Sequence, residues 1–215
     1  MSRREEAKAE NRERILAAAA KIIRQEGFER LTMRHLAESA DVSLRTPYNL
    51  IGSKTQILLG LLEGAGLEVS TTSQGAESPP LGELFGLLNK VETFFGSDPL
   101  FYRDIYGQLM ASNEQEVRQG RVSQIAQICL HLLREAVGRE ELRGETDPET
   151  LGRFLANQLV AFLGMWGAGF FDHRACIAQV RGTWAASLLP YASSKSRPML
   201  EMMCGSVMKG GVLDA

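Results

Sequence analysis

Residues 31–50 read LTMRHLAESADVSLRTPYNL and contain two short apolar segments separated by a polar turn. Thr32 can cap a helix over residues 33–40, because its side-chain oxygen can accept from a free amide of the first turn. Asp41 and Val42 form the turn, and Ser43 can cap a second helix over residues 44–50. Two short helices joined in this way predict a helix-turn-helix, which presents its second helix to the major groove of DNA.

The sequence on both sides of this unit also predicts helices. Before it, a helix over residues 7–26 places five apolar residues on one face and ends at Gly27; they are Ile15, Ala18, Ala19, Ile22 and Ile23. After it, Ser53 and Gln56 have the spacing of a capping box and open a fourth helix that runs through Leu62. We therefore expect an N-terminal DNA-binding domain over residues 1–62.

The order and spacing of residues 10–62 resemble the N-terminal domain of the tetracycline-repressor-like (TetR) family. The motifs that carry the resemblance are Arg14-Ile15-Leu16-x-Ala18-Ala19, Glu26-Gly27-Phe28-Glu29-x-Leu31-Thr32-Met33, Leu36-Ala37-x-x-Ala40-x-Val42-Ser43, Thr46-x-Tyr48 and Ser53-Lys54-x-x-Ile57-Leu58. Asp41 stands where the family commonly has glycine, and aspartate tolerates the left-handed backbone that such a turn needs. The resemblance implies an all-α regulator with a three-helix head and a C-terminal helical domain for ligand binding and dimerisation.

Nine residues of the predicted head are candidates for contact with DNA: Thr32, Arg34, Ser43, Leu44, Arg45, Thr46, Tyr48, Asn49 and Lys54. Arg45 is the leading base reader, since a guanidinium can bond bidentately to guanine; a phosphate contact or a solvated side chain is the alternative. Asn49 is a candidate for reading adenine. The resemblance implies that Tyr48 and Lys54 bind phosphate.

A composition break over residues 69–80, VSTTSQGAESPP, indicates that the domains divide just before it or within it, and we expect a second domain over residues 63–215. The second domain is also expected to be helical. A tail from about residue 193 is expected to be weakly ordered or to carry one short helix. The sequence predicts helices near 81–96, 99–110, 114–137, 148–171 and 174–191.

Residues 154–171 are too apolar for a helix with one buried face, so we expect them to contact both their own core and a partner chain. The family resemblance implies dimerisation through the last two long helices, about residues 148–191. We therefore expect a homodimer with twofold symmetry that binds a near-palindromic, double-stranded DNA operator.

The second domain is also rich in aromatic and sulfur-containing side chains that could line an apolar pocket for an unknown small-molecule effector. The alternative is that these side chains fill the core. The candidate ligand contacts are Phe94, Phe101, Tyr102, Tyr106, Met110, Phe162 and Trp166.

The charge of the chain is unevenly distributed. Residues 1–60 hold 11 basic and 8 acidic residues, whereas the remainder holds 13 and 18, for a total net charge of −2. A mildly basic head on an acidic body suits a protein whose head alone meets phosphates. With no secretory signal and no apolar run of membrane-spanning length, we expect a cytoplasmic protein with no membrane partner.

Signals for an enzyme are weak. The three cysteines and three histidines lack metal-ligand spacing, and no familiar catalytic motif is present, so we expect no metal, no cofactor and no catalytic activity. The predicted function is a sequence-specific transcriptional repressor released from DNA by a small, largely apolar ligand. The alternative is a helical small-molecule carrier or enzyme whose head makes protein contacts.

Overall fold

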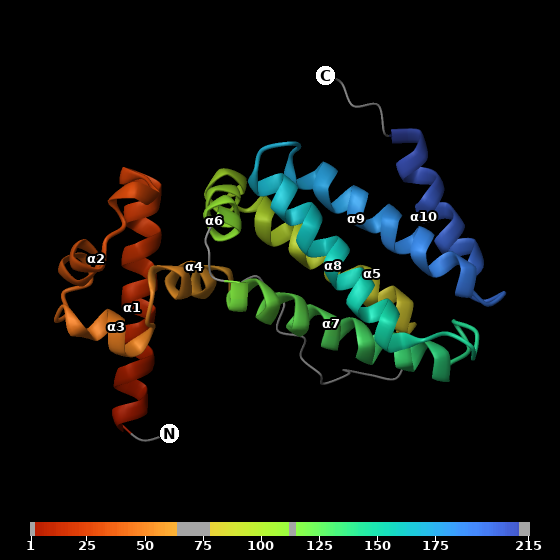
Figure 1. Ribbon diagram of the computed structural model, residues 1–215, viewed down its shortest axis with the longest axis horizontal. Coiled ribbons are helices and arrows are strands. Elements are labelled where there is room, and N and C mark those ends of the chain that lie inside the picture. Colours follow the sequence, from red (N-terminus) through yellow and green to blue (C-terminus); the bar gives the residue numbers. More distant parts are fainter. Residues whose placement is uncertain (1–2, 64–77, 112–114, 211–215) are drawn as a thin grey trace.

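The computed structural model describes residues 3–63, 78–111 and 115–210, and these are helical almost throughout (Figure 1). Most of the predicted linker over residues 69–80 lies outside the described residues. Extended pairing among the described residues is limited to one bridge between Leu142 and Ala192, so the all-α prediction is confirmed. The helices are α1 Arg3–Glu26, η1 Phe28–Arg30, α2 Met33–Ser39, α3 Arg45–Leu50, α4 Lys54–Glu63, α5 Pro80–Gly96, α6 Pro99–Ala111, α7 Gln115–Gly138, α8 Pro148–Gly167, α9 His173–Leu188, η2 Leu189–Tyr191 and α10 Arg197–Gly210.

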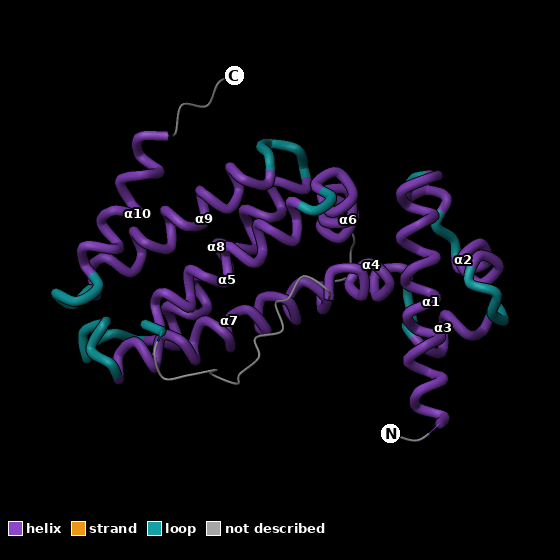
Figure 2. Tube along the Cα trace, turned by 180° about the vertical axis from the view of Figure 1, so that it is seen from behind, coloured by secondary structure: helices purple, strands orange, loops and turns teal. Residues whose placement is uncertain are grey.

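The helices α1 to α4 form a head (residues 3–63) built around α1. The helices α2 and α3 lie against one side of α1, while α4 leads from α1 toward the rest of the molecule (Figures 1 and 2). Ile15, Ile22, Leu36 and Ile57 are almost fully buried between these helices. Apolar burial of this kind supplies most of the stability of helices as short as α2 and α3.

The remaining helices form a larger body (residues 78–210). Its core lies among α5, α7, α8 and α9, and α6 crosses the end that faces the head (Figure 1). The helix α10 packs on α9. Trp184 is fully buried between α8 and α9 and donates from Nε1 to the carbonyl of Leu155 at 3.0 Å, so its one polar atom is satisfied.

Glycine allows α6 to approach α8 very closely. A Cβ atom placed on Gly167 would lie 2.8 Å from the backbone nitrogen of Gly107, and one on Gly107 would lie 2.9 Å from the carbonyl oxygen of Gly167. Real Cβ atoms do not approach backbone atoms so closely, so a side chain at either position would push the two helices apart. This contact therefore fixes the position of α6, the body helix nearest to the head.

The helix ends match the sequence signals in several places. Thr32 accepts from the amide of His35 and Ser53 accepts from that of Gln56, as predicted. Asp147 caps the start of α8. Asp41 adopts the left-handed conformation, with φ of 51°, that the turn requires. None of the described helices is both long and apolar enough to cross a bilayer.

Other predicted helix ends were wrong. The third helix begins at Arg45 rather than residue 44, and Ser43 does not cap it, because the Ser43 hydroxyl bonds to the Thr46 hydroxyl at 2.8 Å. The helix predicted over residues 148–171 ends at Gly167, because Gly169 has φ of +84° and Asp172 caps the next helix. The tail carries one helix, which is the second of the two alternatives predicted for it. This helix, α10, has 14 residues, and the buried side chain of Leu200 anchors it to the core.

Candidate DNA interface and effector site

The turn between α2 and α3 is held by a side chain from α1. Nη2 of Arg14 donates to the carbonyl of Ala40 at 2.7 Å and to that of Asp41 at 3.3 Å. These bonds satisfy carbonyls at the C-terminal end of α2, which have no partner within their own helix. The position of α3 relative to α1 is therefore set by hydrogen bonds as well as by apolar packing.

The helix α3 buries one face and exposes the other. Pro47 is buried against the head, whereas Leu44 and Tyr48 are 48% and 54% exposed although both are large and apolar. Arg45 and Asn49 are exposed on the same helix. The described residues offer Arg45 no hydrogen-bond or ion-pair partner, so its guanidinium is free to bind an external group.

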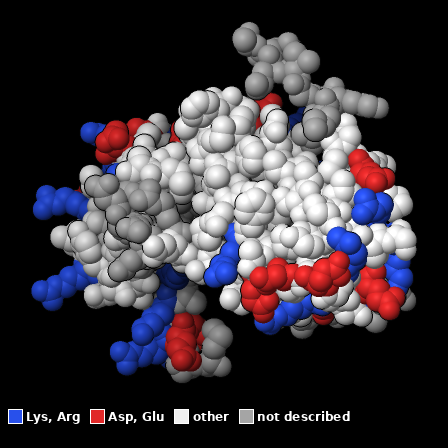
Figure 3. Space-filling model, turned by 45° about the vertical axis from the view of Figure 1, so that its right-hand side comes forward, with Lys and Arg blue, Asp and Glu red and all other residues white. Residues whose placement is uncertain are grey.

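Positive side chains project from the head into solvent (Figure 3). Arg34 on α2 is exposed, and the hydroxyl of Thr32, also exposed, is engaged by the His35 amide. Thr46 is half-buried and paired with Ser43. The predicted contact residues on α2, in the turn and on α3 thus lie along one helix-turn-helix unit, as a groove-binding surface requires.

Lys54 is held inside the head more than the sequence indicates. Its Nζ donates to the carbonyl of Phe28 at 3.2 Å and lies 3.7 Å from the centre of the Phe28 ring. Burial lowers the pKa of Lys54, against the opposing effect of Glu29. The ammonium therefore fixes the connection between α1 and α2, and its binding to phosphate stays a prediction.

The head and the body meet at a polar contact between α1 and the start of α6. Nε of Arg24 pairs with Oδ2 of Asp98 at 2.8 Å, and the same guanidinium lies 4.0 Å from the centre of the Phe101 ring. No sequence pattern predicts this contact; its only local sign is a basic residue in the last turn of α1. Closer to the N-terminus of α1, Arg12 pairs with Glu63 at the end of α4.

The predicted ligand-contacting aromatic residues pack mainly against one another. Phe95, which is 1% exposed, lies 4.8 Å from Trp166 and 5.7 Å from both Tyr102 and Tyr106, measured between ring centres. Phe94 and Phe101 lie beside Tyr102. Edge and tilted contacts at such distances are typical of a filled core.

Two members of the predicted ligand set lie outside this ring cluster. Phe162 packs instead near Phe171 in the loop after α8, at 6.3 Å between ring centres. The side chain of Met110, on α6, lies beside Gly164 on α8. The structure therefore does not gather the seven residues around one space.

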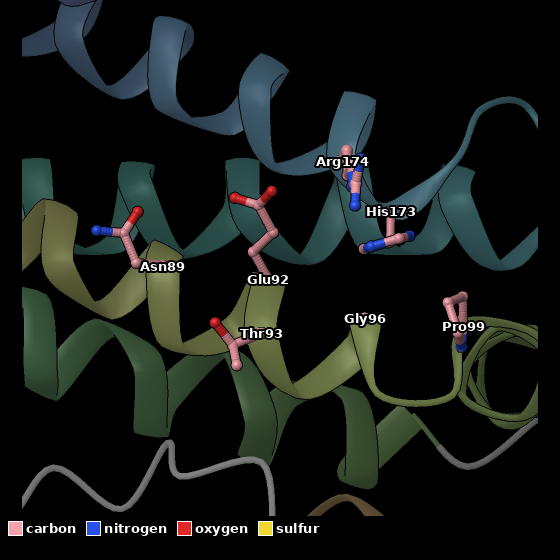
Figure 4. A pocket seen from close by; sticks show the side chains of 7 residues that line it. All are labelled: Asn89, Glu92, Thr93, Gly96, Pro99, His173 and Arg174. Carbon is pink, nitrogen blue, oxygen red and sulfur yellow. The ribbon is translucent and has the colours of Figure 1, made fainter.

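A separate, polar cleft of about 660 Å³ opens between α5 and α9 (Figure 4). The helix α8 lies behind α5 in this view, so the cleft opens away from α8. This site was not predicted from the sequence, because its residues come from segments some 80 positions apart and form no motif. The residues that line it include Asn89, Glu92, Thr93, Gly96, His173 and Arg174.

The cysteines do not offer a reactive thiol in the core. Burial raises the pKa of both Cys129 and Cys176 to about 12, so neither forms a thiolate near neutral pH. All three cysteines are free. Among the described residues, no group of three or more histidine, cysteine, aspartate or glutamate side chains is placed to hold a metal ion.

An exposed recognition helix on a small helical head, joined to a larger helical body, defines a DNA-binding regulator of the helix-turn-helix class. Comparison with known proteins agrees. Residues 15–61 match the model for "Bacterial regulatory proteins, tetR family". The nucleoid occlusion factor SlmA of Sodalis glossinidius (strain morsitans) is 30% identical over 168 residues, which cover 75% of this chain and 83% of that protein. The chain therefore belongs to the TetR family of transcriptional regulators.

Solved structures with low sequence identity share the fold. SmeT, the repressor of the Stenotrophomonas maltophilia multidrug efflux pump SmeDEF, has a TM-score of 0.64 at 20% identity, with 86% of this chain and 92% of SmeT covered. FadR of Thermus thermophilus, a transcriptional repressor solved with lauroyl-CoA, has a TM-score of 0.61 at 22% identity, with 79% and 90% covered. The likeness extends from the head through the body.

Proposed function

We propose that this regulator is a repressor that binds a near-palindromic operator as a homodimer and leaves it when a small molecule binds the body. The observation that carries the proposal is the exposed face of α3, where Leu44, Arg45, Tyr48 and Asn49 project from a helix whose opposite side is buried. FadR and SmeT, both named as repressors, support the choice of repression.

The proposed contacts between the head and DNA are of two kinds. Arg45 and Asn49 read base edges, and Leu44 meets the methyl group of thymine. Thr32, Arg34, Ser43, Thr46, Tyr48 and Lys54 position the head on the phosphate backbone, which gives affinity without sequence preference. In the free protein, the ammonium of Lys54 donates to the carbonyl of Phe28. To bind phosphate, it must either donate a second hydrogen to the phosphate or give up its bond to Phe28.

The homodimer forms through α8 and α9. Phe154 and Met165 are 51% and 42% exposed on α8, and Ala161, also exposed, lies between them at helical spacing. The face of the body seen in Figure 3 carries a wide area without charged side chains. An isologous contact of this face, with twofold symmetry, places two recognition helices in successive major grooves, about 34–36 Å apart. The division of the chain into domains at residue 62 is part of the same proposal.

Selection of genomic fragments with the purified protein, followed by titration of the enriched fragment at several salt concentrations, tests the proposal. We expect enrichment of a near-palindrome, two chains per site and a steep decrease of affinity with salt. Salt-sensitive binding without sequence enrichment would refute an operator-specific repressor. Absence of DNA binding would favour the carrier or enzyme alternative.

Dimer formation has its own test. Ala161→Glu would place a charge on the exposed face of α8, and we expect it to yield monomers in light scattering. Lys90→Glu, an exposed change on α5, is the matched control and should leave the dimer intact. A dimer that survives Ala161→Glu would move the interface away from α8.

A further inference from the structure

The cleft between α5 and α9 has the size and the chemistry of a small-molecule site. Its volume of about 660 Å³ falls within the range of about 300–1,000 Å³ typical of ligand pockets. Asn89, Glu92 and Thr93 line one wall from α5, and His173 and Arg174 line the other from the first turn of α9 (Figure 4). Polar side chains from two helices thus face one space.

One end of the cleft carries donors for an anion. Arg174 is exposed and has no hydrogen-bond or ion-pair partner among the described residues. The neighbouring carboxylate of Asp172 is already engaged, because it accepts from the amide of Ala175 at 2.8 Å and so caps α9. The guanidinium of Arg174 and the ring of His173 are therefore available to a bound group.

The other end of the cleft is held in place by Arg181. Its Nη2 donates to Oδ1 of Asn89 at 2.9 Å and lies 3.7 Å from Oε2 of Glu92. The charges of Arg181 and Glu92 offset each other, while lone pairs of the Glu92 carboxylate stay open to a donor. The Arg174 guanidinium is therefore the positive charge in the cleft that no carboxylate offsets.

Gly96 shapes the wall between the two ends. A Cβ atom at this position would lie 3.2 Å from Nε2 of His173. Glycine therefore lets the imidazole lie directly against the last turn of α5. In the aromatic cluster, rings occupy the space between the helices. The imidazole of His173 lies instead at the edge of an open cleft.

We propose that this cleft binds a small polar anion, with a carboxylate or phosphate between His173 and Arg174 and a hydroxyl or ammonium group donating to Glu92. As an effector site it rests on the proposed repressor function. Pro99 also lines the cleft, and the preceding residue, Asp98, holds Arg24 of α1. A ligand that shifts the start of α6 changes this contact, and with it the attachment of the head.

Binding can be tested without DNA by following the histidine ring signals in NMR during titration. Glycerol 3-phosphate and glycerate are the probes, since they present a phosphate or a carboxylate beside hydroxyl groups; uncharged glycerol is the control. We expect a saturable shift of His173 with at least one anion and none with glycerol. The anion that binds with the higher affinity shows whether the cleft prefers a phosphate or a carboxylate group. No saturation with either anion, or an equal shift with glycerol, would overturn the proposal.

Two variants separate this site from general attraction of anions. Arg174→Gln removes a charge-assisted hydrogen bond and should weaken probe binding about tenfold or more. Lys90→Gln removes an exposed positive charge from α5 outside the cleft and should leave binding unchanged. Equal weakening by both variants would show nonspecific attraction and refute the site.

The link to the head is tested with the selected operator. We expect the bound probe to lower operator affinity of the wild type, and Asp98→Asn to bind the probe normally while losing this response. Probe binding that leaves operator affinity unchanged would overturn the effector role and leave the site itself standing. Because the NMR titration needs no operator, failure of the cleft and failure of the repressor proposal give different results.

Discussion

The head and the body use the same types of side chain in opposite ways. Tyr48 in the head is 54% exposed, whereas Tyr106 in the body is 3% exposed among other rings. Arg45 has no described partner, whereas Arg24, which joins head to body, is engaged by both Asp98 and Phe101. A side chain that is already bonded or packed within its own protein is less available to bind a ligand. The comparison therefore supports the proposals that recognition uses the surface of α3 and the polar cleft, whereas the aromatic core stabilises the fold.

The largest effect is expected from Phe95→Ala. The ring is buried among Phe94, Tyr102, Tyr106 and Trp166, so its removal leaves a cavity that decreases the free energy of unfolding by about 3–5 kcal/mol. Urea denaturation at fixed protein concentration measures the change. Leu100→Ala, at a position that is 65% exposed, should change stability by less than about 0.5 kcal/mol. A loss below about 1 kcal/mol for Phe95→Ala would mean that these rings line an open pocket instead of a core.

Gly167→Ala tests the close contact between α6 and α8. The added methyl group meets the backbone of Gly107, so we expect a loss of about 1–3 kcal/mol in unfolding free energy. Gly86→Ala is the matched control: it lies within α5, and a Cβ there meets nothing within 4 Å. Since alanine favours helix over glycine, Gly86→Ala should be neutral or stabilising by up to about 1 kcal/mol. Equal effects of the two changes would contradict a special contact at Gly167.

In the head, Arg45→Ala should alter recognition without altering stability. Loss of a bidentate contact to guanine relaxes preference at one operator position by about 1–3 kcal/mol. Competition between operators that differ at single positions measures the change, and urea denaturation should give an unchanged midpoint. An unaltered base preference would reduce Arg45 to a phosphate contact or a solvated side chain.

The smallest effect is expected from Lys54→Met, which keeps the apolar stem and removes the charge. If Lys54 contacts phosphate, affinity falls alike for all DNA sequences, and the slope of log affinity against log salt decreases by about one unit. Loss of the cation–π contact with Phe28 costs about 0.5–1 kcal/mol of stability. Lower stability with an unchanged salt slope would assign Lys54 to the structure of the head alone.

Much of the head was predictable because its determinants are close in the sequence. The cap at Thr32, the stop at Gly27, the turn at Asp41 and the cap at Ser53 each act over three or four residues. The apolar face of α1, with Ile15, Ile22 and their neighbours, follows from helical spacing alone. The motifs that resemble the TetR family lie in this same region, and the family assignment is confirmed.

The sequence by itself thus determined the helical class, the recognition unit and the exposed candidates on α3. Only the tertiary structure decided how the side chains of the body are used, because helical spacing marks a residue as apolar without showing what covers it. Packing placed Tyr106 and Trp166 in the core and left Phe162 apart from them. Packing also assembled the polar cleft and the contact between Arg24 and Asp98 from segments far apart in the chain. Such sites depend on the three-dimensional approach of helices, which no local pattern encodes.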